Sequence, residues 1–306
     1  MQATTTHIHT IASSETLNKI ETAVLLELHE KVSIASLLNN SESWNLNKGE
    51  EETAEKIEIQ ALKDLFDLPL HTPTAAIIFT FGTLYTKQRI DQKQMIYLHK
   101  ILNKQDDQWI KRTLKTLEEL NIGWGKHIKN TLTSYDLPTD YSTIQNTHPT
   151  IWKNTVKAAI EKRNHSRLHQ DCHKQVNGTE TEKTKTKSLI SKLTNPDYKR
   201  EAQKEIINST KQQTKTLMIA RFGMLECGKN FRGTIDQHCK KCNCLDDEDH
   251  RLNHCIRWRS INLYDCNEKV DLNAIHSNNL HDLQPIISKI ETLWNTKNAY
   301  GTMNMP

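Results

Sequence analysis

One short segment constrains the fold of this chain more than any other, because residues 239–255, CKKCNCLDDEDHRLNHC, gather four cysteines and two histidines. The residues between them are mostly charged or polar, and such side chains are costly to bury in an apolar core. A structural zinc site needs four Cys or His ligands in a tetrahedron. The two-residue gap between Cys239 and Cys242 suits a tight turn that directs both sulfurs at one ion, and a short helical turn can add His250 and Cys255. The segment therefore predicts a small CCHC zinc knuckle, with zinc as the cofactor.

The same region contains other residues that can bind the ion. Cys244 and His254 lie inside the segment, and His238 and Cys227 lie outside it. Ordinary free cysteines are a less favoured interpretation, because cysteines of the buried kind seldom gather among so many charged residues. Four good ligands leave no position for the water that a catalytic zinc holds. We therefore expect a structural site, with Cys244 and His254 as alternative ligands.

The rest of the chain has the composition of a helical protein with small hydrophobic cores. Hydrophobic residues make up 36% of the 306 residues and charged residues 25%, and only nine Gly and seven Pro interrupt the pattern. Apolar residues recur at helical spacing in several segments. Helices are predicted from Ser14 or Thr16 to about residue 38, and over residues 50–66, 86–102, 107–120, 151–169 and 201–225. The predicted fold class is therefore all-α.

Three features between these helices lead to separate predictions. PTAAIIFTFGTLY, residues 73–85, is the one stretch that we expect to be extended. Residues 173–187 are polar and aperiodic, which favours a linker. Asp106 and Asp107 are placed to cap the helix of residues 107–120, and Gly123 supplies its stop signal.

Three further segments carry a family resemblance: LLNNSESWNL (37–46), LPLHTPTAAIIFTFGTLYTKQRIDQKQMIYLHKIL (68–102) and LMIARFGMLECGKNFRG (217–233). Together with the Cys cluster they resemble the C-terminal region of non-LTR (LINE-type) retrotransposon reverse transcriptases. The first is similar to the segment that leaves the catalytic palm, the second to the thumb helices, and the third to the stretch before the terminal zinc knuckle. One departure is that Asn39 and Asn40 stand where the family usually has Tyr-Gly.

The resemblance implies how the chain is divided. Within the knuckle, the family's four ligands fall on Cys239, Cys242, His250 and Cys255. The implied regions are an N-terminal helical segment (1–40), a thumb-like helical domain (41–150), a basic helical linker region (151–230), the zinc knuckle (231–260) and a C-terminal tail (261–306). The implied partners are RNA or DNA, and a reverse-transcriptase palm domain.

A polymerase palm uses paired aspartates to hold two metal ions. The adjacent pairs in this chain are Asp106-Asp107, at a predicted helix start, and Asp246-Asp247, inside the zinc loop. We interpret the first as a helix cap and the second as a solvated turn. The chain is therefore predicted to be a nucleic-acid-binding accessory region rather than an enzyme. Two alternatives stay open: a degenerate transposon-derived interaction or structural protein, and a subunit that completes a separately encoded palm.

Basic residues are concentrated after residue 150. Residues 151–230 contain 17 Lys and Arg against 8 Asp and Glu. Four of these cations recur at spacings of four and seven residues, and on one continuous helix they would form a positive stripe: Arg200, Lys204, Lys211 and Lys215. Lys240 and Lys241 would extend it into the knuckle. The stripe predicts a nucleic-acid-binding surface, and the alternative is an ordinary solvated helix face.

The tryptophans and the apolar stretches of the chain lead to further predictions. Trp109, Trp124 and Trp152 could stack on bases, although packing in a core is the commoner role. No stretch reaches about 18 clean apolar residues, so no membrane span is predicted. The first residues also lack the features of a signal peptide. We therefore expect an intracellular protein, nuclear or cytoplasmic, within a ribonucleoprotein.

Overall fold

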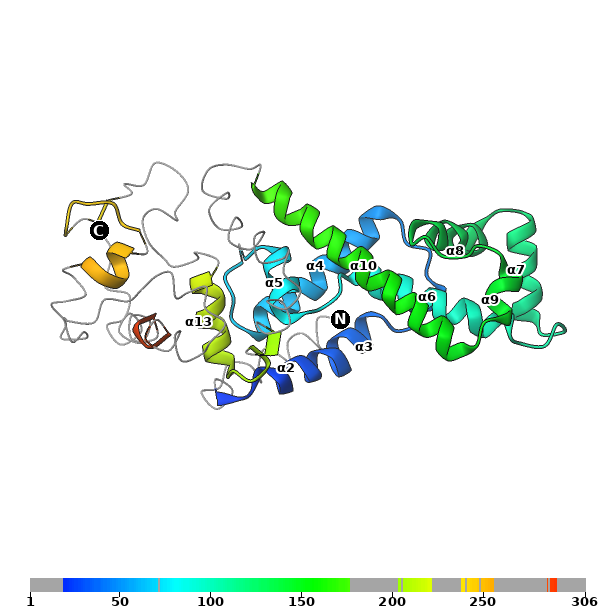
Figure 1. Cartoon of the computed structure of the whole chain (residues 1–306), viewed down its shortest axis with the longest axis horizontal. Coiled ribbons are helices and arrows are strands. Elements are labelled where there is room, and N and C mark those ends of the chain that lie inside the picture. Colours follow the sequence, from blue (N-terminus) through cyan, green and yellow to red (C-terminus); the bar gives the residue numbers. More distant parts are fainter. Residues whose placement is uncertain are drawn as a thin grey trace. The chain divides into compact units, whose positions relative to one another are not determined.

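A computed structural model describes residues 19–70, 72–176, 203–204, 206–221, 238–239, 241–247, 249–255, 285 and 287–290 (Figure 1). Most of these described residues are helical and none lies in a strand, which confirms the all-α prediction for this part of the chain. The helical elements follow one another in this order: α2 (Thr22–Leu28), η2 (His29–Ile34), α3 (Ala35–Leu37), η3 (Ser41–Ser43), α4 (Lys48–Leu65), α5 (Thr74–Phe81), α6 (Thr86–Leu102), α7 (Trp109–Glu119), α8 (Gly123–Ser134), α9 (Tyr141–Asn146), α10 (Pro149–Val176), α13 (Lys211–Arg221) and η5 (His250–His254).

The chain folds as two compact units, each assembled from segments far apart in the sequence. Among the described residues, the first unit comprises residues 27–62 and 82–171, and the second comprises residues 19–26, 63–81 and those from 172 onward. The domains predicted from the sequence are contiguous. The two units do not test that division, which stays a prediction.

Helix α6 is the central element of the first unit and packs against η3, α7, α8 and α9. Helix α10 lies beside α6 (Figure 1), and the indole Nε1 of Trp152 on α10 donates to the Met95 carbonyl on α6 at 3.0 Å. Near the other end of this pair, the Tyr85 N–H donates to the side-chain oxygen of Asn164 at 3.4 Å. The start of α6 thus lies near the later part of α10, so the two helices are antiparallel.

The core of this unit follows from a repeat of four residues along α10. Every fourth side chain from Trp152 to Leu168 is buried, and Val156 and Ile160 are fully so. Trp152, Val156 and Ile160 pack with Met95 and other apolar residues of α6, α8 and α9. Residues four apart lie on one face of a helix, so this spacing alone is enough to bury one side of α10 and expose the other.

The segment that resembles the exit from a palm is docked against α6. Asn40 adopts a left-handed backbone conformation, with φ +57°, at a position where the sequence resemblance leads us to expect glycine. Ser41 is buried, and the side chain of Gln94 donates to the carbonyls of Ser41 and Trp44 at 3.3 and 2.7 Å. An asparagine therefore makes a turn here that glycine adopts easily.

Asn and Asp also end several helices in this glycine-poor chain. Asn121 follows α7 with φ +51°, its N–H donates to the Glu118 carbonyl, and the Ile122 N–H donates to the Leu117 carbonyl. This is the Schellman arrangement. Asp67 after α4 and Asp136 after α8 repeat it. The predicted stop at Gly123 is therefore wrong, because Asn121 ends α7 and Gly123 is the first residue of α8.

The start of α7 also differs from the prediction. The helix begins at Trp109, and Gln108 is its N-terminal flanking residue. Asp106 instead forms an ion pair with Lys111 at 2.6 Å, and the carbonyl of Asp107 accepts hydrogen bonds from Arg112. The Asp106 carboxylate and the Asp107 carbonyl therefore contact basic side chains of the first turn, and neither aspartate side chain caps the helix.

Two short helices between Gly123 and Pro149 had not been predicted. Helix α8 packs against α7, and α9 begins after Asp140, whose carboxylate accepts hydrogen bonds from the N–H groups of Ser142 and Thr143. This side-chain cap is the usual start of a helix. It was a signal that the sequence contained and that the prediction missed.

The stretch predicted to be extended is helical. Residues Thr74–Phe81 form α5, and every residue from Ala75 to Phe81 is buried. A continuous apolar run has no periodicity that separates a strand from a buried helix. Burial on all sides, including a stacked contact between Phe66 and Phe81 with ring centroids 4.5 Å apart, resolves the ambiguity in this second unit.

The helix predicted over residues 201–225 is interrupted. The described residues turn at 208–210 before α13 begins at Lys211. At the turn, the Ser209 carbonyl accepts from the Thr22 N–H at 2.8 Å, and the Lys211 N–H donates to the Ile20 carbonyl at 2.9 Å. Pairing with another segment of the second unit therefore takes the backbone groups that a continuous helix would use.

The remaining helix predictions agree in position with small differences. Helix α6 begins and ends at the predicted residues, and α4 begins two residues before the predicted start. The first predicted helix is present from Thr22 but passes through the π-helical segment η2, and its predicted start lies outside the described residues. Helix α10 continues to Val176, into the predicted linker, whose other residues lie outside the described part.

Candidate metal centre

A tight turn presents the first two cysteines of the cluster. His238 and Leu245 form an isolated antiparallel bridge, and the Cys239 N–H donates to the Cys244 carbonyl at 2.8 Å. Inside this closure the N–H groups of Cys242 and Asn243 both donate to the Cys239 carbonyl. Asn243 takes a left-handed conformation, with φ +52°, which lets the chain reverse directly after Cys242.

A helical turn presents the other two residues of the cluster, His250 and Cys255. The carboxylate of Asp247 accepts a hydrogen bond from the His250 N–H at 2.8 Å and so fixes the start of η5. At its end the Cys255 N–H donates to the His250 carbonyl at 2.7 Å, which brings the two side chains to one side. Asp247 is thus a structural cap, and Asp246 is buried, so the prediction of a solvated turn is wrong for this pair.

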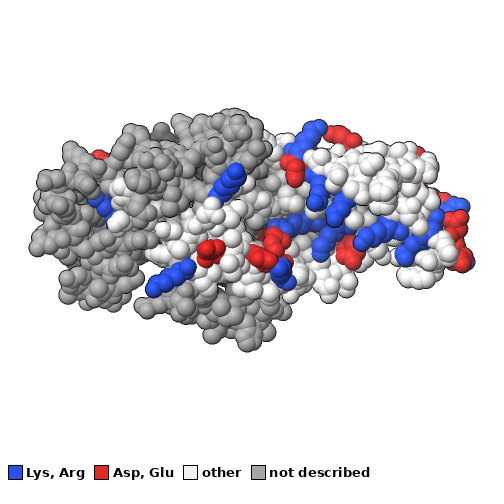
Figure 2. Space-filling model, turned by 60° about the horizontal axis from the view of Figure 1, so that its bottom comes forward, with Lys and Arg blue, Asp and Glu red and all other residues white. Residues whose placement is uncertain are grey.

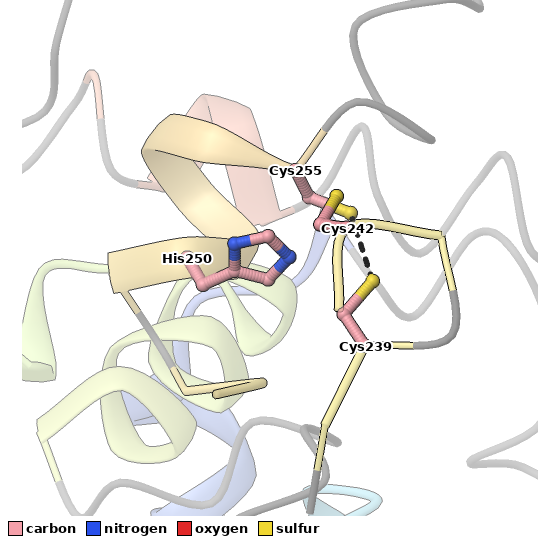
Figure 3. Close-up of side chains that lie close together, drawn as sticks. All are labelled: Cys239, Cys242, His250 and Cys255. Atoms are coloured by element: carbon pink, nitrogen blue, oxygen red, sulfur yellow. Dashed lines mark hydrogen bonds between the residues drawn. The ribbon is translucent and has the colours of Figure 1, made fainter. Parts of the chain in front are cut away.

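The four side chains converge (Figure 3). One ligand atom from each of Cys239, Cys242, His250 and Cys255 lies within 4.8 Å of all the others. The sulfurs of Cys239 and Cys255 are 3.7 Å apart. Two sulfurs held about 2.3 Å from an ion at the tetrahedral angle are separated by about 3.8 Å. This pair therefore already has the spacing of two ligands, and the four predicted residues are those that the structure brings together.

The environment of Cys239 favours its thiolate. Burial raises the pKa of its thiol, but a hydrogen bond with His250 and the backbone N–H groups of Lys241 and Cys242 outweigh that effect and lower the pKa to about 6. The thiolate is the form that binds metals. Cys239 is therefore prepared to act as a ligand near neutral pH.

The alternative ligands lie differently. The Cys244 sulfur is 3.2 Å from Nδ1 of His250, but its side chain is exposed. Partial desolvation, and then the neighbouring Cys242 and Cys239, raise the pKa of its thiol. The His254 ring is directed to Asp249, with Nε2 3.4 Å from the carboxylate. Both residues thus lie beside the cluster, and Cys227 lies outside the described residues.

The predicted basic stripe is not one exposed surface among the described residues. Lys204 is exposed, but Lys211 is only 1% exposed, and its Nζ lies 2.9 Å from the Asp67 carboxylate. Lys215 is half-buried, and burial lowers its pKa. Since the turn at residues 208–210 also separates Lys204 from the others, the helical wheel does not apply across it. Lys241 is exposed near the cluster, and Arg200 and Lys240 lie outside the described part.

The three tryptophans are distributed between core and surface. Trp152 is buried, so its core interpretation is confirmed, and Trp124 is half-buried with its Nε1 donating to the Glu42 carbonyl at 3.1 Å. Trp109 is 75% exposed. Among these three, Trp109 alone presents its ring to solvent.

Cations and acids are interleaved over much of the described surface. Figure 2 shows Lys and Arg side chains following one another across one face, with Asp and Glu side chains beside several of them. The ion pairs include Lys87 with Glu51 and Arg89 with Glu30, both at 2.5 Å. A cation that has no such partner is therefore a more informative feature than a cation that is merely exposed.

Comparisons of the chain with protein-family models, with curated proteins and with solved structures give no match. Among the described residues, no helix combines the length and the apolar character that crossing a membrane requires. The interpretation of the site therefore rests on its own geometry.

Proposed function

We propose that this chain is a nucleic-acid-binding accessory region whose C-terminal part is organised by one structural zinc ion. The single observation that carries the proposal is the convergence of Cys239, Cys242, His250 and Cys255 within 4.8 Å. Three sulfurs and one imidazole are a typical ligand set for structural zinc. Four protein ligands complete the tetrahedron, so the site is suited to holding a fold together.

The charges at the site are compatible with zinc. Three thiolates and a neutral imidazole around a divalent cation leave about one net negative charge. The exposed Lys241 lies between two of the ligands in the sequence and can offset part of it. When bound, the ion would supply folding free energy of about 10–16 kcal/mol for such a knuckle at pH 7. The turn and η5 would then be stable only with the metal in place.

Two features support the nucleic-acid part of the proposal. Residues 151–230 are strongly basic, with 17 Lys and Arg against 8 Asp and Glu. Three segments and the cysteine spacing resemble the thumb, linker and knuckle of LINE-type reverse transcriptases. Neither adjacent aspartate pair resembles the metal-binding pair of a palm, because Asp106 is paired with Lys111 and Asp247 caps η5. An accessory role, alone or beside a separately encoded palm, therefore fits better than catalysis by this chain.

The proposal is tested on the full chain in two measurements. Metal analysis after gel filtration should give one zinc per chain. Fluorescence anisotropy with a labelled mixed-sequence single strand should show binding that weakens steeply with salt, since phosphate contacts release counterions. A chain that retains no metal would refute the zinc centre, and a metal-loaded chain without nucleic-acid affinity would leave the structural-protein alternative.

A further inference from the structure

The second half of helix α6 carries three exposed cations on one side. We call them the α6 lysine row: Lys93, Lys100 and Lys104. The helical path continues beyond the last residue of α6, because the Asn103 N–H donates to the His99 carbonyl at 3.2 Å and the Lys104 N–H donates to the Ile101 carbonyl at 3.0 Å. Helical geometry therefore describes the whole row.

The spacing places the three lysines on a common face. At about 100° per residue, Lys100 is turned about 20° from Lys93 to one side and Lys104 about 20° to the other. At about 1.5 Å per residue, the row extends for about 16 Å along the helix axis. Met95 and Leu98, which are fully buried, lie about 140–160° away from Lys93 on the same wheel. The core therefore covers the opposite side of α6 and leaves the row in solvent.

The α6 lysine row is not neutralised by the described part of the protein. No acidic residue occurs between Asp91 and Asp106. Asp91 is buried on the opposite side of the helix, and Asp106 is paired with Lys111. Within the part of the chain that the structure describes, the row forms no ion pair, and its one side-chain hydrogen bond runs from Lys93 to the Leu38 carbonyl at 2.9 Å. A backbone carbonyl positions this lysine but does not cancel its charge.

The first turns of the same helix are different. Lys87 is paired with Glu51, and Arg89 is paired with both Glu30 and Glu58. The cations at the start of α6 thus have acidic partners, whereas those of the row have none among the described residues. The last two lysines of the row are four residues apart, a spacing at which like charges on a helix repel. An external anion would relieve this repulsion.

An aromatic side chain beside the row indicates the kind of anion that would fit. Tyr97 lies about 40° from Lys93 on the helical wheel, and along the axis it stands between Lys93 and Lys100. Its ring packs edge-on against Trp124, with ring centroids 6.3 Å apart, and both residues stay partly exposed. Unpaired bases stack on aromatic side chains of this kind, whereas the bases of a duplex are already stacked on one another. Lysines next to a partly exposed tyrosine therefore favour a single strand.

We infer that the α6 lysine row binds the phosphates of a single-stranded polynucleotide, with one base of the strand against Tyr97. This rests on the proposed nucleic-acid function and gives it a location different from the stripe of Arg200, Lys204, Lys211 and Lys215. Phosphate contacts carry no sequence information, and every base can stack on an aromatic ring, so binding at this surface is tolerant of sequence.

The test compares three triple variants of the full chain, purified with zinc present. In the first, each lysine of the row is replaced by glutamine: Lys93→Gln, Lys100→Gln and Lys104→Gln. In the second, arginine replaces the same three residues and keeps their charge. The matched control is Lys48→Gln with Lys56→Gln and Lys126→Gln, which removes three lysines of α4 and α8 that are also exposed and unpaired among the described residues. Anisotropy is measured with mixed-sequence single strands of RNA and of DNA, and with a duplex, over a range of salt.

The glutamine variant of the row should bind the single strand at least about tenfold more weakly at about 0.15 M salt. Its slope of log K against log salt should flatten by about 2, since each phosphate contributes about 0.7. The arginine variant and the control should keep both affinity and slope. Unchanged binding by the glutamine variant overturns the inference, as does equal weakening in the control, equal affinity for the duplex or equal competition by polyglutamate.

A second measurement uses the unmodified chain and does not depend on the folding of a variant. A single strand that contains iodouracil, crosslinked with ultraviolet light and analysed by mass spectrometry, should attach to Tyr97. Trp109, which is 75% exposed and lies outside the row, is the internal comparison. Crosslinks at Trp109 without any at Tyr97 overturn the inference. Failure of the proposed function has a different signature, because the unmodified chain would then bind no nucleic acid at all.

Discussion

At the scale of single residues, the candidate metal centre depends on which side chains two short turns direct inward. The left-handed Asn243 reverses the chain after Cys242, and Asp247 fixes the start of η5. His250 and Cys255 are buried by the same turns, whereas Cys244 stays exposed. Backbone conformation therefore separates ligands from neighbours of identical chemistry.

A first prediction follows for the ligands. Cys239→Ser, Cys242→Ser, His250→Ala and Cys255→Ser should each lose the zinc, because three ligands do not complete a structural tetrahedron. Cys244→Ser and His254→Ala, the control variants, should retain one zinc per chain in elemental analysis. Loss of zinc from Cys244→Ser together with its retention in Cys242→Ser would show that the ligand set is wrong.

The second prediction concerns His29 in the π-helical segment η2. We expect this residue to make the stability of the protein depend on pH. Burial, only partly opposed by Glu30 and reinforced by Arg89, lowers the pKa of His29 from 6.5 to about 4. Its Nε2 has no hydrogen-bond partner among the described residues. Between pH 6.5 and 4 the unfolded chain therefore binds a proton that the folded chain does not. The stability that His29 contributes is complete above pH 6.5 and is lost as the pH falls through this window.

Because of His29, the free energy of unfolding should fall by about 2–3 kcal/mol between pH 7.5 and 4.5. In His29→Gln the free energy of unfolding, measured with urea and tryptophan fluorescence, should fall less over that interval. His165→Gln, at an exposed position, is the control and should keep the pH dependence of the unmodified chain. Identical pH dependence in His29→Gln and the unmodified chain would contradict the assignment.

At the scale of elements, the first unit depends on close approach between helices as well as on apolar stripes. The Schellman turn at Asn121 reverses the chain between α7 and α8, which pack against each other. Gly125 lies where they meet. A Cβ atom there would be 2.9 Å from the backbone carbon of Leu117 and 3.0 Å from the Glu118 nitrogen. Backbone atoms cannot move aside as a flexible side chain can.

Gly125→Ala should therefore destabilise the first unit by about 1–3 kcal/mol, the usual cost of overpacking. Thermal and urea unfolding would measure the change. Gly49→Ala is the matched control, because the nearest atom to its Cβ would be the Asn47 side-chain oxygen at 3.4 Å. We expect less than about 1 kcal/mol there. Equal effects of the two substitutions would argue against close helix approach as the cause.

At the scale of the whole molecule, the proposal is a protein that binds and does not catalyse. The buried carboxylates of the first unit are already engaged: Glu58 accepts a hydrogen bond from Thr86 at 2.5 Å, and Asp91 accepts one from Tyr135 at 2.8 Å. Asp106 is exposed and paired with Lys111. These carboxylates therefore do not form the pair that holds two catalytic metal ions.

The corresponding prediction is that the purified chain incorporates no nucleotide on a primed template, with or without added magnesium. A reverse transcriptase of known activity serves as the positive control. Incorporation by the chain that is abolished by Asp106→Asn would contradict the prediction. Addition of a palm fragment then asks whether activity appears only in the mixture, as expected for a subunit of a divided polymerase.

The sequence by itself determined the features that depend on local spacing. The chain has few glycines and prolines, and its apolar residues recur every three to four positions. These two features predicted an all-α fold and placed α6 at its observed ends. The spacing of Cys239, Cys242, His250 and Cys255 identified the four residues that converge. Each of these is a property of one turn or one helix, so neighbours in the sequence are sufficient to define it.

Only the tertiary structure decided which faces are covered. It made residues 74–81 a buried helix, interrupted the helix at residues 208–210 by pairing with residues 20–22, and buried Lys211 against Asp67. It also separated the buried Trp152 from the exposed Trp109. These outcomes depend on free energies of contact between segments far apart in the chain, and no local pattern contains that information.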